Sequence, residues 1–290
     1  MASTGSGKVS SGRGRIAVEI NCVERVLIGA ADLGAARERW NRAGFALAAE
    51  KITAGGIEFA PMAAGGVEID LCAAGSDASG PLADAIRGAA ARGGAVLGWI
   101  WGTTSYDATA ARSGAPIAVP AARGAIINAW MPPADLRAEL PGVFTATTEV
   151  STSLEARRQN LARFGANPNT AAYLEHIVVM TPVLEAAIAA HERMGVKCKR
   201  IREAGGGARQ AFFKLEQTVL EVVAPARGAP GCWGLAFMCG DIARAVAHAR
   251  EAGLQATEPK TAIQGGQIAR IVDPLDGVAI AFMEPPPPAG

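Results

Sequence analysis

The sequence is poor in aromatic and charged residues, and each shortage narrows the possible functions. Aromatic residues make up 5% of the 290 residues and charged residues 19%, with a formal net charge of +1. Since no long basic stretch occurs, neither nucleic acid nor an anionic membrane is expected as a partner. No run of 18 apolar residues is present, so no membrane span is expected.

Cysteines are also few, and the first residues do not have the pattern of a signal peptide. The five cysteines include no C-x-x-C pair, and their odd number and loose spacing predict reduced thiols in a cytoplasmic protein. Residues 1–15 are rich in Gly and Ser and lack an apolar segment of signal-peptide length. They are expected to form a disordered tail.

A repeat is present in the remaining sequence. In three segments an apolar strand leads into an amphipathic helix that stops at a glycine. The glycine follows the helix start by 12 residues each time, from Asp32 to Gly44, from Val183 to Gly195 and from Asp241 to Gly253. Glycine adopts the left-handed conformation just past a helix end without steric cost. A weaker fourth copy runs over residues 97–114.

Short strand-like runs separated by Gly, Asp and Pro turns follow these helices. The plan of each module is therefore strand, helix and three strands. The sequence predicts an α+β fold of four βαβββ modules paired into two domains, residues 16–133 and 173–285. Residues 134–172 fit no module and are expected to be a linker with its own helix over 153–164.

Two motifs of the second half resemble the opening and closing signatures of glyoxalase and extradiol dioxygenase modules: residues 174–179 with the helix that follows, and residues 272–280. The lead-in Asn167-Pro168-Asn169 resembles the approach to the second half of glyoxalase-like proteins. The chain is thus similar to the vicinal oxygen chelate superfamily, which includes glyoxalases, bleomycin-resistance proteins and extradiol dioxygenases. The resemblance implies two tandem glyoxalase-like domains, in each of which paired modules form an open cup around a substrate.

The resemblance also implies a pair of site residues. Metal-binding members place one ligand on the first strand of a module and another on the last strand. His176 and Glu221 match these positions, and alternation along a strand turns His176 toward the cup. They are candidate catalytic residues and candidate ligands of a divalent metal (Zn, Mn, Fe or Ni). An acid/base pair without metal is equally plausible.

The other modules depart from this pattern. The positions equivalent to His176 are Arg25, about Ile100 and Gly234, and those equivalent to Glu221 are about Asp70, Asn128 and Ala281. One His and one Glu are too few for the 2-His-1-carboxylate iron site. A ring-cleaving dioxygenase is therefore disfavoured, as is a complete four-ligand glyoxalase site.

Further candidates lie outside this pair. Arg25 and Asp70 are predicted either to form an ion pair between strands or to recognise an anionic substrate. Asn128 and Trp233 are candidate substrate-binding residues, and alternate strand tryptophans are expected to form an aromatic wall in a cup. His191 and His248 lie within module helices and are expected on outer faces.

The leading hypothesis is a lyase or isomerase of vicinal oxygen chelate type that acts on a small oxygenated, possibly aromatic, organic molecule in the second cup. The alternative is a metal-free protein that binds and sequesters a small molecule, as bleomycin-resistance proteins do. A third hypothesis makes the first half a structural partner without a site of its own. A homodimer is possible under each.

Overall fold

The computed structural model describes residues 20–103, 107, 110, 111, 114, 116–120, 126–140, 146–149, 153–263 and 265–286. Within these ranges, side chains are not described for 116–120, 126–128 and 146–149. The expected tail, residues 1–15, and most of the helix expected between residues 97 and 114 lie outside the described residues. No helix in the described part of the chain is long and apolar enough to cross a membrane.

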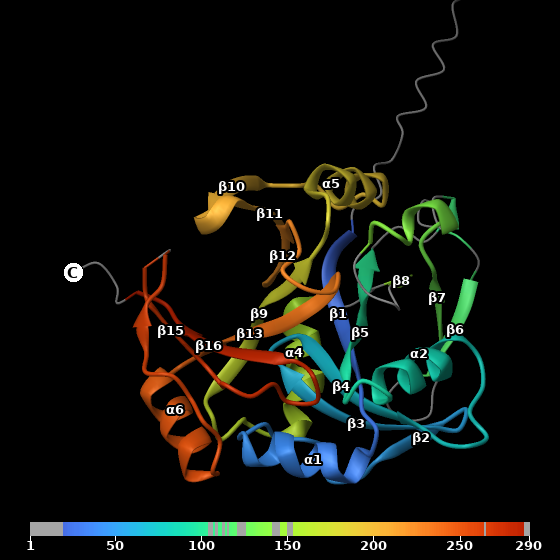
Figure 1. Ribbon diagram of the computed structural model, residues 1–290. Helices are drawn as coiled ribbons and strands as arrows, with labels where there is room; N and C mark the ends of the chain where they lie inside the picture. The colour runs from blue at the N-terminus through green and yellow to red at the C-terminus, as the bar shows by residue number, and fades with distance from the viewer. Residues whose placement is uncertain are drawn as a thin grey trace, which may run out of the picture.

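The described residues of the first half form one eight-stranded sheet with the helices α1 and α2 (Figure 1). Its elements are β1 (Ile20–Gly29), α1 (Leu33–Arg42), β2 (Ile52–Ala54), β3 (Ile57–Ala64), β4 (Val67–Ala74), α2 (Pro81–Ala90), β5 (Ala95–Thr103), β6 (Pro116–Pro120), β7 (Ile126–Trp130) and β8 (Ala146–Glu149). The strand order is β2-β3-β4-β1-β5-β8-β7-β6.

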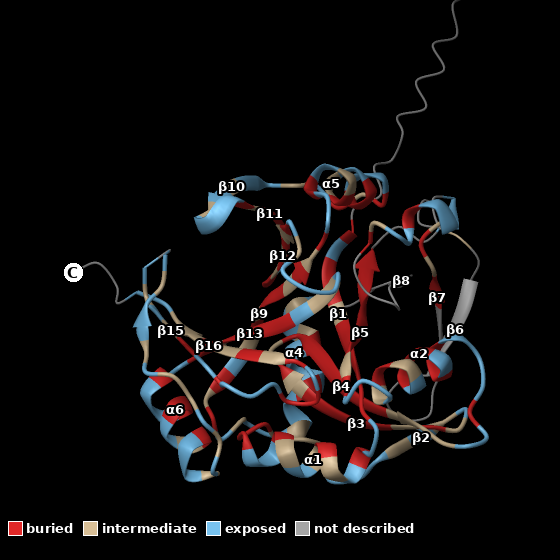
Figure 2. Ribbon diagram, viewed as in Figure 1, coloured by how far each residue is buried: buried red, intermediate tan, exposed pale blue. Residues whose placement is uncertain are grey.

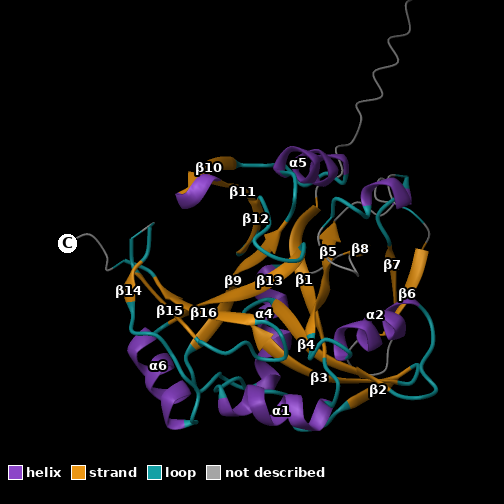
Figure 3. Ribbon diagram, viewed as in Figure 1, coloured by secondary structure: helices purple, strands orange, loops and turns teal. Residues whose placement is uncertain are grey.

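The second half repeats this order in a second eight-stranded sheet, β10-β11-β12-β9-β13-β16-β15-β14. A linker helix, α4 (Leu154–Leu161), precedes it. Its elements are β9 (Ala171–Met180), α5 (Leu184–Arg193), β10 (Arg200–Ala204), β11 (Ala208–Leu215), β12 (Thr218–Ala224), β13 (Gly231–Cys239), α6 (Ile242–Glu251), β14 (Lys260–Thr261), β15 (Gln267–Arg270) and β16 (Ala279–Glu284). The α+β fold of four modules in two curled sheets is confirmed (Figure 3).

The three predicted module helices end as expected. Helices α1, α5 and α6 each have 10 residues, and the glycine past each end has a positive φ, +83° at Gly44, +93° at Gly195 and +79° at Gly253. The Asp32 side chain accepts a hydrogen bond from the Ala35 amide, and Asp241 caps α6 in the same way. Local chemistry therefore determines where these helices begin and end.

The two halves share one hydrophobic core. Residues from the outer faces of both sheets meet in it, including Trp101 of β5, Phe213 of β11 and Phe237 of β13. Helix α1 belongs to the first half, yet its Trp40 donates from Nε1 to Oδ2 of Asp276, 3.0 Å away, in the turn before β16. The halves are therefore built as one packed body, with their two concave faces turned away from each other (Figure 1).

The lead-in motif before β9 joins the two halves. Asn167 accepts a hydrogen bond from the Ala46 amide (2.8 Å), and its amide group donates to the Ala171 carbonyl (2.8 Å). Asn169 is fully buried and donates to the Ala43 carbonyl, also over 2.8 Å. Both side chains thus satisfy backbone groups at the end of α1 and the start of β9.

Two elements differ from the sequence expectation. Strand β8 lies within residues 134–172, which the sequence analysis assigns to the linker, and it pairs in parallel with β5 as the last strand of the second module. The first sheet therefore extends beyond residue 133. Helix α2 is an insertion between β4 and β5 that the module plan does not contain. The linker helix begins at the predicted position, with Ser153 as its N-cap.

Candidate functional site

One pair of positions recurs in all four modules. In each module the first member lies on the first strand. The second member lies on the last strand, two residues after the register partner of the first member. The register gives Arg25 with Asp70, Ile100 with Thr148, His176 with Glu221, and Gly234 with Ala281. Residues two apart on a strand face the same side, so Arg25 with Asp70, and His176 with Glu221, face the cup of their half.

Asn128 does not hold the position that the sequence analysis gives it. It lies on β7, where it pairs with Ala118 of β6. The strand parallel to β5 is β8, and its register places Thr148 at the position equivalent to Glu221. The difference arises because β8 lies in the segment that the sequence assigns to the linker, which makes β7 the last recognisable strand of the second module.

The cup of the first half is filled by helix α2. Leu82, Ile86 and Ala89 of α2 are buried against Leu27, Phe59, Cys72, Leu97 and Ile100 of the sheet. Figure 1 shows α2 within the curl of the first sheet, and Figure 2 shows β3, β4 and β5 mainly buried. The face that could surround a ligand in this half is therefore part of a second hydrophobic core.

Arg25 and Asp70 form a buried ion pair beside this core. Arg25 also lies 3.2 Å from Glu68, measured from Nε to Oε1, and Asp70 is fully buried. Burial raises the pKa of Asp70, and the Arg25 charge opposes the rise. The structure thus shows the ion pair that the sequence analysis names as one of two alternatives. It places both residues in the first cup, and a role in substrate binding stays a prediction.

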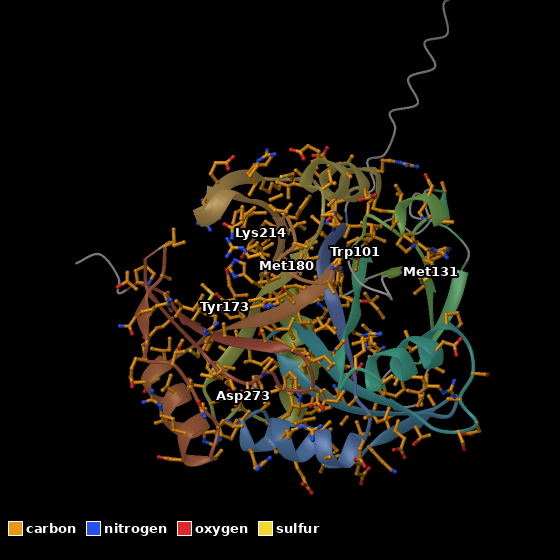
Figure 4. All side chains as sticks on the ribbon, in the orientation of Figure 1. Trp101, Met131, Tyr173, Met180, Lys214 and Asp273 are labelled. Atoms are coloured by element: carbon orange, nitrogen blue, oxygen red, sulfur yellow. The ribbon has the colours of Figure 1, made fainter. Side chains whose placement is uncertain are left out.

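The cup of the second half has no helix inserted into it among the described residues. Side chains on its face are partly exposed where the matching ones of the first cup are buried: Val178 matches Leu27, Gln210 matches Phe59, and Val223 matches Cys72. Figure 2 shows the mixed burial of β10 to β16. In Figure 4, Lys214 and Met180 are labelled near the inner side of this sheet.

Glu221 is held in a chain of polar side chains. Gln210 Nε2 donates to Glu221 Oε1, and Arg202 Nε donates to Gln210 Oε1 over 3.0 Å. Burial raises the pKa of Glu221, and the charges of Arg202 and Arg200 oppose the rise. The amide of Gln210 therefore fixes one carboxylate oxygen and links it to an arginine at the edge of the sheet.

His176 is buried, with 7% of its surface exposed. Burial lowers its pKa to about 4, and the charges of Lys214 and Arg202 lower it further. The imidazole is therefore neutral near pH 7. His176 and Glu221 are both described, and no hydrogen bond joins them. His176 and Glu221 share the cup face of their sheet, as Arg25 and Asp70 do in the first half. At those equivalent positions the side chains of Arg25 and Asp70 are in contact.

The residues of the second cup do not fit a resident metal centre. Among the described residues, no group of three or more His, Cys, Asp or Glu could hold an ion. A Cβ added to Gly234 would lie 2.5 Å from the Ala279 carbonyl oxygen, so the backbone leaves no space for a ligand side chain there. Two donors beside the cations Lys214 and Arg202 would bind a divalent cation weakly.

The expected aromatic wall is absent from the described part of the cups. Trp99 and Trp101 are fully buried in the shared core, and Trp130 is buried as well. Trp233 is 48% exposed at a bulge of β13, and its role in substrate binding stays a prediction. His191 is fully buried rather than on an outer face, because its ring fills the space beside Phe213.

The polar neighbours of the pair are not among the residues expected from the sequence. They are Arg200, Arg202, Gln210 and Lys214. Alternation gives a signal: Arg200 and Arg202 are two apart on β10, and Gln210 and Lys214 share one face of β11 with Phe212 between them. The face to which they turn depends on the pairing of β11 with β12.

No protein-family model and no curated protein matches the sequence. Among solved structures, a fusion protein of a xylose isomerase-like TIM barrel with 4-hydroxyphenylpyruvate dioxygenase has a TM-score of 0.63 and 14% identity, with 94% of this chain covered. The chain spans about half the length of that protein, 50%.

A mutant of 4-hydroxymandelate synthase from Streptomyces coelicolor has a TM-score of 0.63 and 12% identity, and the match covers 93% of this chain and 94% of that one. Methylmalonyl-CoA epimerase from Mycobacterium tuberculosis matches 41% of this chain with 21% identity and a TM-score of 0.36, too low to support a conclusion. The first two are vicinal oxygen chelate proteins, and the chain has the two-domain form of their fold.

Proposed function

We propose that the second cup binds a small oxygenated organic molecule and that His176 and Glu221 act on it as an acid/base pair, in lyase or isomerase chemistry. One observation carries the proposal. Of the four equivalent pairs, His176 with Glu221 is the one that combines two titratable side chains with a face that no helix covers in the described structure.

The protonation states suit different roles for the two residues. A neutral His176 accepts a proton or a hydrogen bond, and Glu221, whose pKa burial raises, is easier to protonate than an exposed carboxylate. Two titratable groups in different environments are a common arrangement for proton transfer. Proteins of the same fold are named for enzymes, but a fold does not determine chemistry.

The experiment is a screen of small oxygenated compounds for turnover, with metal analysis of the purified protein. We expect His176→Ala and Glu221→Ala to reduce turnover by about 100-fold or more, the usual contribution of an acid or base. The control is His248→Gln, because His248 is a half-buried histidine outside the cup. Unchanged turnover in both cup variants would refute the proposed roles.

The second candidate function is binding without turnover, as expected of a sequestering protein. A specific observation favours it. A histidine with a pKa of about 4 is a weak base near pH 7, and the fourth module adds no donor at Gly234 or Ala281. The two candidates differ in one readout: a compound that binds the cup and is recovered unchanged after long incubation supports sequestration, whereas conversion excludes it.

A further inference from the structure

Three cationic side chains line the part of the second cup formed by β10 and β11, and we call them the cationic edge: Arg200, Arg202 and Lys214. The guanidinium carbons of Arg200 and Arg202 lie 4.8 and 5.3 Å from the centroid of the Phe212 ring. Stacking on an aromatic ring orders a guanidinium group. Arg202 also donates from Nε and Nη2 to Oε1 of Gln210.

The cationic edge belongs to the candidate site. Arg202 and Arg200 both act on the pKa of Glu221, and Lys214 and Arg202 both act on that of His176. These charges reach the pair because cross-strand partners face the same side of the sheet, as Phe212 and Glu221 do.

The first cup shows that this chemistry is not imposed by the fold. At the same register positions the side chains are apolar: Ile52, Phe59 and Ala63 stand where the second cup has Arg202, Gln210 and Lys214. In the first cup Ile52 and Phe59 pack in the core that contains the apolar side of α2, whereas in the second cup the equivalent positions hold polar side chains. A difference at equivalent positions of one chain indicates that the two cups have different tasks.

The charges on this face do not balance. On the described cup face of β10 to β12, Glu221 is the one carboxylate against three cations. The nearby carboxylates Glu185 and Glu203 pair with Arg209, whose side chain lies on the opposite face of β11. An anionic group that enters the cup would therefore meet an excess of positive charge.

The part of the cup across from the cationic edge carries apolar side chains on β13 and β16. Met238 of β13 and Met283 of β16 are half-buried cross-strand neighbours there, beside the small side chains Ala236 and Ala281. Arg270 of β15 lies next to Ala281 on this face, and Met180 lies at the far end of β9, beside Val223. Methionine side chains adapt to the shape of an apolar ligand. The cup thus has the cationic edge on β10 and β11 and apolar side chains on β13 and β16, and the strands of His176 and Glu221 lie between them.

We infer that the second cup takes a small organic acid, whose carboxylate is bound by the cationic edge and whose apolar part lies against the methionines. A planar guanidinium fork matches a carboxylate with two parallel hydrogen bonds. This inference rests on the proposed function, since it names the substrate class of that site.

The test is a ligand titration of the full chain, monitored through the 13C-methyl NMR signals of its methionines. The probes are benzoate and phenylacetate, their neutral amides benzamide and phenylacetamide, and inorganic phosphate. We expect the two acids to shift the signals of Met180, Met238 and Met283 and to bind at least about tenfold more tightly than the amides. Phosphate, which lacks an apolar part, should shift these three signals little.

The variants Arg200→Gln, Arg202→Gln and Lys214→Gln should each weaken acid binding by about fivefold or more. Arg209→Gln is the matched control, because it removes the same charge from the other face of β11. The methyl spectrum itself shows whether each variant is folded, and Arg200 and Lys214, which are both exposed, remain informative if Arg202→Gln does not fold.

Three outcomes would overturn the inference: acids that bind no more tightly than amides or not at all, phosphate that displaces the acids at equal concentration, or an Arg209→Gln effect as large as those at the cationic edge. Failure of the proposed function is distinguishable. If acids bind and His176→Ala leaves turnover unchanged, the acid/base roles are refuted and the organic-acid ligand is not. If a neutral compound is turned over and the turnover depends on His176, the organic acid is refuted as the substrate class and the acid/base roles are not.

Discussion

Acidification should destabilise the protein through His191, and His191→Phe should abolish that part of the loss. The ring is fully buried, with its centroid 4.6 Å from that of Phe213 and 5.9 Å from that of Trp101. Nδ1 lies 2.7 Å from the Ala187 carbonyl oxygen, and within the described structure Nε2 has no hydrogen-bond partner. Burial lowers the pKa of His191 to about 4.

The sign follows from the lowered pKa. In the unfolded chain the imidazole takes up its proton near pH 6.5, whereas in the folded protein it does so near pH 4. Between these values the unfolded state binds more protons, so stability is complete above about pH 6.5 and falls as the pH decreases toward 4. At about pH 5 the loss amounts to roughly 2 kcal/mol.

The measurement is urea denaturation of the wild type and of His191→Phe at about pH 7.5 and about pH 5. Phenylalanine keeps an aromatic ring against Phe213 and Trp101 but cannot be protonated, and His176 is present in both proteins. The difference in unfolding free energy between the two proteins should change by roughly 2 kcal/mol between the two pH values, in favour of the variant at low pH. A constant difference would show that His191 is not the buried neutral group described here.

Two further predictions concern stability. Gly44→Ala should cost more free energy of unfolding than Gly253→Ala, about 2 kcal/mol against about 1 kcal/mol. Both residues have a positive φ, but only at 44 would the added methyl group meet a neighbour: it would lie 2.6 Å from a ring carbon of the α6 histidine, whereas nothing lies within 4 Å at 253. Thermal unfolding of both variants tests this, and equal losses would contradict it. Asp70→Asn should cost about 3 kcal/mol, since Arg25 stays buried with one remaining carboxylate, whereas Asp84→Asn in an exposed pair should cost below about 1 kcal/mol. Urea titrations that rank Asp84 above Asp70 would refute this.

The elements that local chemistry defines were predictable from the sequence. The capping residues Asp32 and Asp241 and the terminal glycines determine three helices, and each lies where the repeat places it. The linker helix also begins at its predicted cap, Ser153. These features depend on side chains within one turn of the backbone groups that they satisfy, so no tertiary knowledge is needed.

Elements defined by distant pairing were not predictable in the same way. Strand β8 has four residues, and it is recognisable as a strand because it pairs with β5, about 45 residues earlier in the chain. Helix α2 carries usable local signals, with Pro81 at its start and Gly93 and Gly94 beyond its end. Its place inside the first cup depends on the shape of the sheet, which no local pattern encodes.

The candidate site divides along the same line. His176 and Glu221 follow from the family resemblance, because strand positions are preserved in a repeated module. The neighbours that set their protonation come from β10 and β11, and alternation alone leaves open which face of those strands turns inward. For that reason the sequence indicates which residues form the pair but not the charges around them.

The contrast between the two cups follows from one physical requirement. A concave sheet face lined by Leu27, Phe59 and Ile100 must be covered, because exposed apolar surface of that extent is unfavourable in water, and α2 covers it with its own apolar side. The second face could not accept such a helix without burying Arg202 and Lys214 against apolar side chains, at a large desolvation cost. The same fold thus gives one cup closed by its own chain and one whose charges favour an anionic ligand.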